Sequence, residues 1–334
     1  MLSTLKRVTV LGLLLMILTL PCVSLGEEPS RAAQANLPQV NSPVIELMPE
    51  WAPVPFLEKE NTLAVYTIPV GAQDAYLIVC DGHAMVLDCA ALGQRPVEDY
   101  LLRLLVALGI DRLDYAVNTH PHKDHMMGFA ELLSHVPADV FYTCFPRNHN
   151  GPQRNLMRDL ARLGIPVVDY EPGTPFTLGG AQITTWQMRA VNNDNDRSLI
   201  LRLQYGERSI LFTADIQLTT QRIFAETCGT GLESDIMKLP HHGIGDLSGK
   251  LVRAVKPGLC WASNSVKYKG CKLQVKTCQL NEVPLIFTAY VPMVMVTDGT
   301  TWQVQVWHED SIELPHFRMI TDREDEQIGL EQAV

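Results

Sequence analysis

A short segment in the first half of the chain concentrates side chains that can bind metal ions. The segment reads Thr-His-Pro-His-Lys-Asp-His over residues 119–125, directly after an apolar run at residues 113–117. Imidazole and carboxylate groups are ligand types that zinc, manganese and iron accept. A strand that ends at the apolar run can turn all of these groups into one pocket. The candidate ligands in this segment are His120, His122, Asp124 and His125.

Two later strand ends supply further candidate ligands. Asp215 follows the apolar strand expected at residues 209–213, and His241 and His242 follow another such strand, before Gly243. An aspartate in this position often caps a helix, and a single histidine there is often structural. Two adjacent histidines before a glycine that permits a sharp turn, in a chain that already carries the first segment, indicate metal ligands.

The number of candidate ligands suits a site with two divalent metal ions, Zn2+ or Mn2+. The expected ligands of the first ion are His120 and His122. Those of the second ion are Asp124, His125 and either His241 or His242. Asp215 would bridge the ions, because a carboxylate can give one oxygen to each metal. Such a pair, about 3.5–4 Å apart, lowers the pKa of a shared water towards about 7, so that a metal-bound hydroxide is the nucleophile. Asp124 could also carry a proton to the leaving group.

The elements that must position these residues alternate between strands and helices. Several strands also form hairpin pairs; for example, residues 75–80 and 84–89 flank the turn at residues 81–83. A purely parallel, doubly wound sheet would not contain such pairs. We therefore expect an α+β fold with two mixed β-sheets and helices on the outside.

Length and charge limit the classes of function. The chain has 334 residues, of which 46% are hydrophobic, and a formal net charge of -10. It can therefore form one large domain or two small ones. The acidic balance argues against a stable, unassisted complex with nucleic acid. It does not exclude a nuclease, because bound divalent metals reverse the local electric field.

Composition divides the chain into four segments. A signal peptide at residues 1–26 precedes a proline-rich linker at residues 27–60, which we expect to be an extended tether. A folded domain occupies residues 61–308, and residues 309–334 form a charged tail.

The N-terminus has the pattern of a secretory signal. Lys6 and Arg7 precede an apolar run at residues 8–20, and residues 24–26 form a cleavage motif before Glu27. An uncleaved anchor is the alternative, although the run is short for a membrane span. We expect the protein to be exported, and to lie outside a bacterial cell or on its surface. It would meet the membrane only through this segment, if the segment stays uncleaved.

Cysteine usage leaves two alternatives open. The chain has eight cysteines and no Cys-x-x-Cys pair, which argues against a cysteine-based zinc site. In an exported protein, Cys80 with Cys89 or Cys271 with Cys278 could form a disulfide. The alternative is that these residues are buried free thiols.

Taken together, these motifs resemble the metallo-beta-lactamase superfamily. The shared pattern is a strand, His-x-His-x-Asp-His, a later strand-end aspartate and a late strand-end histidine. Finer details resemble the C-terminal hydrolase domain of ComEC-type DNA-uptake proteins. Those details are residues 70–75, 195–203, 241–243, 255–257 and 297–299. The resemblance covers about residues 62–306. It implies an αββα sandwich, a centre of two Zn2+ or Mn2+ ions, and hydrolysis, with phosphodiesters as the favoured substrates.

The chain departs from this family pattern at the first metal ion. The family's usual third histidine for that ion is missing, and the equivalent stretch is residues 192–198. Asp194, Asn195 or Asp196 could reach the ion, or water could complete its shell. A Tyr-Gly-His-Pro segment typical of the ComEC branch is replaced by residues 267–271, and we expect no membrane channel of the kind found in that branch.

Three hypotheses about function follow. The first is an exported metal-dependent hydrolase that acts on a phosphodiester, either a small molecule or a nucleic-acid fragment. The second is a lactone, amide or thioester hydrolase, because the same metal-hydroxide serves acyl transfer and a fold alone does not choose the substrate. The third is a metal-binding module with little catalysis, which the altered stretch at residues 192–198 motivates.

Overall fold

The computed structural model describes residues 39–48 and 60–306, apart from residues 92, 94 and 266. The predicted signal peptide, the charged tail and most of the predicted linker lie outside the described residues. Among the described residues, no helix combines the length and the apolar character needed to cross a membrane.

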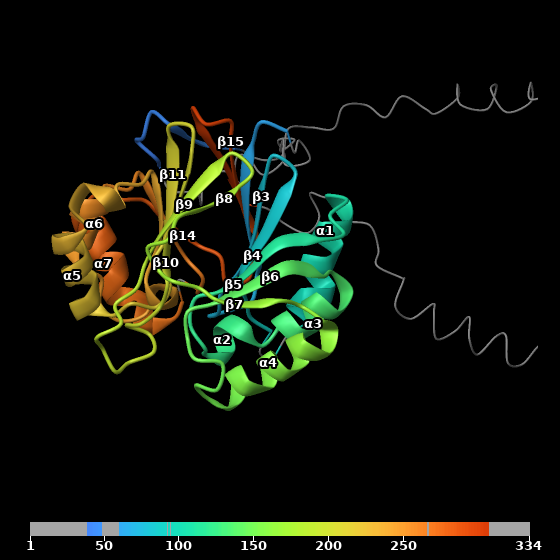
Figure 1. Ribbon diagram of the computed structural model, residues 1–334. Coiled ribbons are helices and arrows are strands. Elements are labelled where there is room, and N and C mark those ends of the chain that lie inside the picture. Colours follow the sequence, from blue (N-terminus) through green and yellow to red (C-terminus); the bar gives the residue numbers. More distant parts are fainter. Residues whose placement is uncertain (1–38, 49–59, 92, 94, 266, 307–334) are drawn as a thin grey trace, which may run out of the picture. The chain divides into compact units, whose positions relative to one another are not determined.

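Two mixed β-sheets form the centre of the fold (Figure 1). Within the described residues, the first sheet has nine strands in the order β1-β16-β15-β2-β3-β4-β5-β6-β7. Its strands are β1 (Ile45–Leu47), β2 (Leu63–Thr67), β3 (Ala75–Cys80), β4 (His83–Cys89), β5 (Leu113–Asn118), β6 (Ala138–Thr143), β7 (Val167–Asp169), β15 (Met293–Thr297) and β16 (Trp302–Val306).

The second sheet has seven strands among the described residues, in the order β14-β13-β12-β11-β10-β9-β8. Its strands are β8 (Phe176–Leu178), β9 (Ala181–Trp186), β10 (Ile200–Tyr205), β11 (Arg208–Phe212), β12 (Ile236–Lys238), β13 (Leu259–Ala262) and β14 (Leu285–Phe287). Both sheets contain parallel and antiparallel pairs, as the hairpin pattern predicts.

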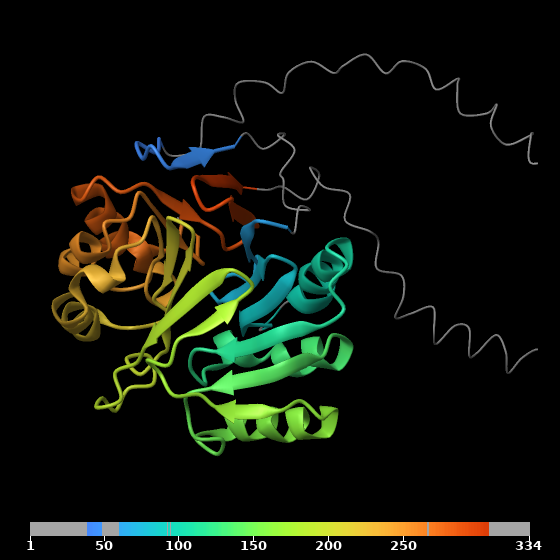
Figure 2. The same cartoon turned by 45° about the horizontal axis from the view of Figure 1, so that its top comes forward.

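Helices cover the outer face of each sheet (Figures 1 and 2). Those over the first sheet are η3 (Val97–Leu101), α1 (Leu102–Ala107), α2 (Lys123–Met126), α3 (Phe129–His135) and α4 (Gly151–Leu163). Those over the second sheet are α5 (Leu218–Thr227), α6 (Gly249–Val255) and α7 (Lys272–Leu280). In α6, Leu251, Val252 and Val255 are buried, and in α7, Gln274 and Cys278 are buried.

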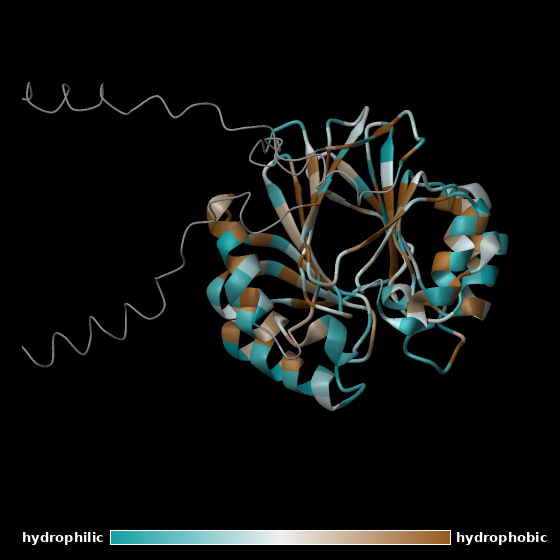
Figure 3. Cartoon of the chain, turned by 180° about the vertical axis from the view of Figure 1, so that it is seen from behind, coloured by the Kyte–Doolittle hydropathy of each residue, from teal (hydrophilic) through white to brown (hydrophobic). Residues whose placement is uncertain are grey.

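Three apolar layers hold these elements together. In β3, Leu77 packs towards the helices of the first sheet, whereas Ile78 packs between the two sheets. Successive strand residues point to opposite faces, so a strand that is covered on both sides reads as a continuous apolar run. In Figure 3, hydrophobic colour lies along the strands and hydrophilic colour on the outer surfaces of the helices. The expected αββα sandwich of two mixed sheets is confirmed.

The linker prediction needs a correction at residues 39–48. This stretch contains β1, which pairs in parallel with β16, with Ile45 opposite Trp302. Ile45 is buried between the sheets. Its partner strand lies at the other end of the domain's sequence, so no local periodicity could reveal the pairing.

The register of the β3–β4 hairpin excludes one of the possible disulfides. Cys80 pairs with His83 beside the turn, whereas Cys89 pairs with Ala75 at the far end of the hairpin. Six strand residues at about 3.3 Å each separate the two ends, which is far beyond the reach of a disulfide. All cysteines among the described residues are free thiols, including Cys271 and Cys278.

A close backbone approach joins the two sheets at one edge. Gly206, in the β10–β11 turn, has a φ of +57°, and a Cβ there would lie 2.7 Å from the Gly299 carbonyl oxygen. The backbone N–H of Glu207 donates to that same oxygen at 2.8 Å. Gly299 belongs to the β15–β16 turn of the first sheet, so the contact ties one sheet to the other.

We expect Gly206→Ala to lower the free energy of unfolding by about 3 kcal/mol, because it combines left-handed strain with a backbone clash. Gly229→Ala is the matched control, since Gly229 has a φ of +51° but open space around its Cα. It should cost about 1 kcal/mol. Urea unfolding of both variants in the presence of chelator measures the difference. Equal losses would contradict a structural role for the turn-to-turn contact.

Candidate metal centre

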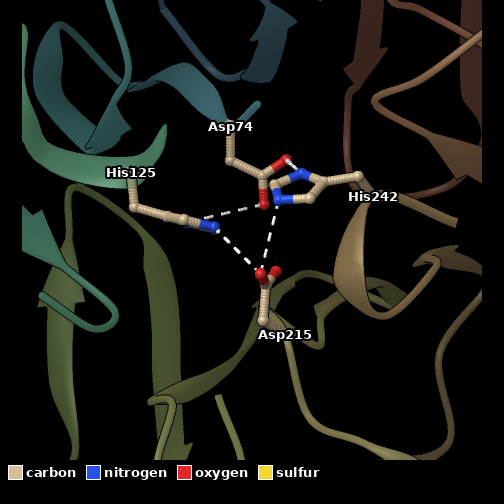
Figure 4. Close-up of side chains that lie close together, drawn as sticks. All are labelled: Asp74, His125, Asp215 and His242. Atoms are coloured by element: carbon tan, nitrogen blue, oxygen red, sulfur yellow. Dashed lines mark hydrogen bonds and ion pairs between the residues drawn. The ribbon is translucent and has the colours of Figure 1, made fainter. Parts of the chain in front are cut away.

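Loops at one edge of the sandwich bring the candidate ligands together. The first histidine segment follows β5, Asp215 follows β11, and η5 (His241–Gly243) follows β12. Because β4, β5 and β6 are parallel, as are β11 and β12, the carboxyl ends of these strands meet at one edge of each sheet. Figure 4 shows the central group, which consists of Asp74, His125, Asp215 and His242.

One carboxylate oxygen, Asp215 Oδ2, stands among histidine nitrogens. It lies 3.2 Å from His125 Nε2, 3.3 Å from His242 Nε2 and 3.8 Å from His120 Nε2. All four side chains are almost completely buried. Asp124 Oδ2 approaches the same group from the more exposed side, 3.4 Å from His242 Nε2.

Asp88, at the end of β4, orients the first histidine segment. Its Oδ2 lies 2.8 Å from His125 Nδ1 and accepts a hydrogen bond from Thr119 Oγ1 at 2.7 Å. Its Oδ1 accepts from the backbone N–H of Thr119 at 2.8 Å. Thr119 Oγ1 in turn lies 3.1 Å from His120 Nδ1. With Nδ1 engaged in this way, Nε2 of each histidine is the nitrogen that faces the centre.

Asp74, which directly precedes β3, orients His242 in the same manner. His242 Nδ1 lies 3.2 Å from Asp74 Oδ1, an oxygen that also accepts hydrogen bonds from Tyr76 and Ser263. The other oxygen, Asp74 Oδ2, pairs with Lys238 Nζ at 2.5 Å. Because both carboxylate oxygens of Asp74 already contact other groups, we interpret Asp74 as a residue that orients the ligand His242 and not as a ligand itself. Carboxylate–histidine pairs of this kind typically lie behind metal-bound histidines.

The arrangement around Asp215 fits a divalent metal ion. Ligand atoms that lie about 2.0–2.1 Å from one tetrahedral zinc ion are roughly 3.3 Å apart. The three distances that join His125 Nε2, Asp215 Oδ2, His242 Nε2 and Asp124 Oδ2 are 3.2, 3.3 and 3.4 Å. His125 Nε2 and His242 Nε2 are also buried, and neither makes a hydrogen bond of good geometry, so both nitrogens point at a common space. Buried polar atoms without partners are costly, and a shared metal ion would satisfy both.

The first-ion candidates lie beside this group. His120 Nε2 is 3.1 Å from His122 Nδ1, close to the spacing of two ligands on one ion. The opposite nitrogen, His122 Nε2, lies 4.0 Å from Asp194 Oδ2. Asp194 is itself held by His149, whose Nε2 lies 2.8 Å from the same oxygen. Asp194 therefore lies on the side of the His122 ring that faces away from His120.

The remaining candidate ligands, Asp196, Asn195 and His241, differ in their contacts. Asp196 Oδ1 accepts a hydrogen bond from the backbone N–H of Gln217, at the start of α5, and so is already engaged. Asn195 is buried and faces His241, with its Nδ2 3.5 Å from His241 Nε2. His241 Nε2 lies 4.0 Å from Asp215 Oδ2. Of the two adjacent histidines, the geometry therefore favours His242 as the partner of Asp124 and His125.

Sequence reasoning missed three residues that support the site. Lys238, Asp74 and Asp88 are fully buried and carry charge. Lys238 Nζ lies 3.5 Å from Asp215 Oδ1 and donates to the Ala214 carbonyl at 3.0 Å. A lysine within the apolar run of β12 was a signal that could have been noticed, because lysine is almost never fully buried unless it is paired.

Burial and charge set the pKa values in the group. Burial alone would raise the pKa of Asp215, but His242, His125 and Lys238 outweigh it and hold that pKa well below its usual range. Burial alone would lower the pKa of His125, but Asp215 and Asp88 raise it to about 10. Metal ligands must be deprotonated, so an ion that binds here would displace protons from the histidines.

Comparisons with known proteins indicate the family of the chain. A family model described as "Metallo-beta-lactamase superfamily" matches residues 68–258. The chain is 25% identical over 206 residues to Competence protein ComA of Neisseria gonorrhoeae, covering 61% of this chain and 27% of that protein. It is 27% identical over 187 residues to Recombination protein 2 of Haemophilus influenzae, covering 54% of this chain and 21% of that protein. The chain thus spans about a quarter of the length of these relatives.

Solved structures with a similar fold include the metallo-beta-lactamase fold protein YhfI from Bacillus subtilis, with a TM-score of 0.48, 12% identity, and coverage of 69% of this chain and 98% of that one. Another is CmlA, a diiron beta-hydroxylase from Streptomyces venezuelae, with a TM-score of 0.48, 15% identity, and coverage of 71% of this chain and 54% of that one. The family match spans more than half of the sequence and includes the first histidine segment, Asp215 and both adjacent histidines. The chain therefore belongs to the metallo-beta-lactamase superfamily.

Proposed function

We propose that this protein is a metal-dependent hydrolase that cleaves phosphodiesters, in a small molecule or a nucleic-acid fragment. The observation that carries the proposal is the convergence of three buried histidine Nε2 atoms on Asp215 Oδ2, with Asp124 beside them. Two divalent ions, Zn2+ or Mn2+, would be held there. When bound, they activate a water molecule near neutral pH and stabilise charge on the attacked phosphate.

The exposure of the side chains supports one direction of approach. His122, Asp124 and His241 are 40%, 34% and 33% exposed, whereas His120, His125 and Asp215 are at most 1% exposed. A substrate would therefore meet the centre on the side of the three partly exposed residues. The buried residues would hold their positions and exclude water from the other side.

Asp124 is the side chain best suited to move a proton. Burial alone would raise its pKa, but the neighbouring His242 and His125 hold the pKa below its usual value, so Asp124 is a carboxylate at neutral pH. In hydrolysis of a phosphodiester, a bond forms from the water oxygen to phosphorus, and the bond from phosphorus to one ester oxygen breaks. Asp124 would take the proton that the water loses and return it to the departing alcohol oxygen.

The choice of phosphodiesters rests on the relatives, and the charge of the chain permits it only with bound metal. The chain carries a net charge of -10, and its site is rich in aspartate, so an anionic substrate needs bound cations to approach. One curated relative is named Recombination protein 2, and recombination is a process of DNA. A name supports only the class of substrate, because this chain spans 21% of that protein.

We expect the purified protein to hydrolyse bis(p-nitrophenyl) phosphate with zinc or manganese, and to lose this activity after treatment with chelator. His125→Ala should lower the rate by about 100-fold or more and reduce the bound metal, because it removes a buried ligand. His135→Ala, which changes an exposed histidine, should leave both unchanged. Hydrolysis of lactones but not of phosphodiesters would favour the acyl-transfer hypothesis, and bound metal without any hydrolysis would favour the binding module.

Asp124→Asn should lower kcat by about 10²–10⁴-fold, because the amide cannot accept the proton of the attacking water. Elemental analysis of the same sample separates this effect from a loss of metal. Asp169→Asn, at an exposed aspartate, is the control and should retain full activity. An Asp124→Asn variant that keeps its metal and its kcat would rule out the proton-transfer role.

We also propose that the protein is exported, because residues 1–26 have the pattern of a signal peptide. When the full chain is produced in a bacterium, the recovered protein should begin at Glu27 and lie outside the cytoplasm. Mass spectrometry of the intact protein checks the cleavage, and cell fractionation checks the location. A full-length product in the cytoplasm would contradict the proposal.

A further inference from the structure

We propose that His241 is a ligand of the first metal ion, so that the two adjacent histidines serve different ions. His242 would bind the second ion, together with His125 and Asp124. The inference rests on the metal centre proposed above and extends it to the ligand that the first ion otherwise lacks. Among the described residues, the protein groups gathered for that ion are His120, His122 and Asp215.

The backbone of the turn aims both histidines at the same oxygen. His241 and His242 have φ values of 52° and 55°, a left-handed conformation that is uncommon outside glycine. The His241 N–H donates to the Ala214 carbonyl at 2.9 Å, and the Ile244 N–H donates to the His241 carbonyl at 2.7 Å. Two consecutive strained residues persist only where the surroundings fix them, and such strain clusters at functional sites.

The distances to Asp215 Oδ2 divide the histidines into two pairs. His125 and His242 have their Nε2 atoms at 3.2 and 3.3 Å, whereas His120 and His241 have theirs at 3.8 and 4.0 Å. Within the closer pair, His242 also contacts Asp124. In the described part of the chain, no ion pair joins Asp124 to His241. By this distance His241 groups with His120 rather than with the closer pair, and the inference assigns both to the first ion.

Among the residues that the structure describes, no other acidic side chain nearby is available for this position. Asp194 is held by His149 and stands behind His122, and the Asp196 carboxylate caps the start of α5. The remaining competitor is the amide oxygen of Asn195, a buried atom without a hydrogen-bond partner. Imidazole is a usual protein ligand of zinc and an amide oxygen is not, so the donor chemistry favours His241.

The test measures metal binding by the full chain, without substrate. The variants are His241→Gly, which keeps the left-handed backbone accessible, Asn195→Ala, and His83→Ala as a control at an exposed histidine. Each protein is loaded with zinc, freed of excess metal and analysed for zinc equivalents, and the weaker dissociation constant is measured against a chelating dye. Thermal melting of the metal-free proteins checks that each variant is folded. If His241→Gly does not fold, His241→Asn replaces it, because asparagine tolerates the same φ.

We expect two zinc equivalents in the wild type, Asn195→Ala and His83→Ala, and one in His241→Gly, with the weaker dissociation constant raised by about 100-fold or more. Two equivalents in His241→Gly, with both constants unchanged, would overturn the inference and leave the metal centre in place. Loss of one equivalent in Asn195→Ala but not in His241→Gly would overturn it in favour of the amide. One equivalent or none in the wild type would overturn both this inference and the proposed two-ion centre.

Discussion

The buried carboxylate of Asp215 is the constraint around which both halves of the fold are arranged. It stands at the end of β11 with 1% exposure, and a charge in that position costs several kcal/mol unless opposite charges lie close to it. His125, from α2, and Lys238, from β12, supply such charges. His125 lies in a helix that follows β5 of the first sheet, and Lys238 lies in the second sheet. The two sheets can therefore satisfy Asp215 only in one relative arrangement, so the site helps to fix the packing on which it depends.

Hydrogen bonds from residues around the site orient the histidine rings, so that their Nε2 atoms face the centre. Asp88 has a φ of 52°, a strained value for a residue other than glycine. Its hydrogen bonds with Asn118, Thr119 and His125 hold it in that conformation. The same bonds fix where β5 ends and how the histidine segment leaves it. A change at Asp88 would therefore act through the direction of the His125 ring, although Asp88 itself does not face the centre.

The sequence predicted the parts of this site that depend on local order along the chain. Apolar runs marked the strands, and ligand types at strand ends marked residues 120–125, Asp215 and the adjacent histidines. It could not predict the supporting residues, because their contacts are far apart in sequence: Asp74 lies 168 residues from His242. The same limit applies to β1, whose partner strand ends the domain. The choice between His241 and His242 needed the left-handed turn of η5, which a sequence pattern does not specify.

Charge balance indicates that the proposed anionic substrate would approach this centre only when metal is bound. Asp74, Asp88, Asp124 and Asp215 supply four negative charges, and Lys238 supplies one positive charge. Without metal, neighbouring carboxylates raise the pKa of His125 to about 10 and that of His242 well above its usual value, so two protonated histidines leave a small negative balance. Two divalent ions would displace those protons and turn the balance to about one positive charge as long as the bound water is neutral. The group would then attract a phosphodiester, which carries one negative charge. The same metals that supply the chemistry would therefore also admit the substrate.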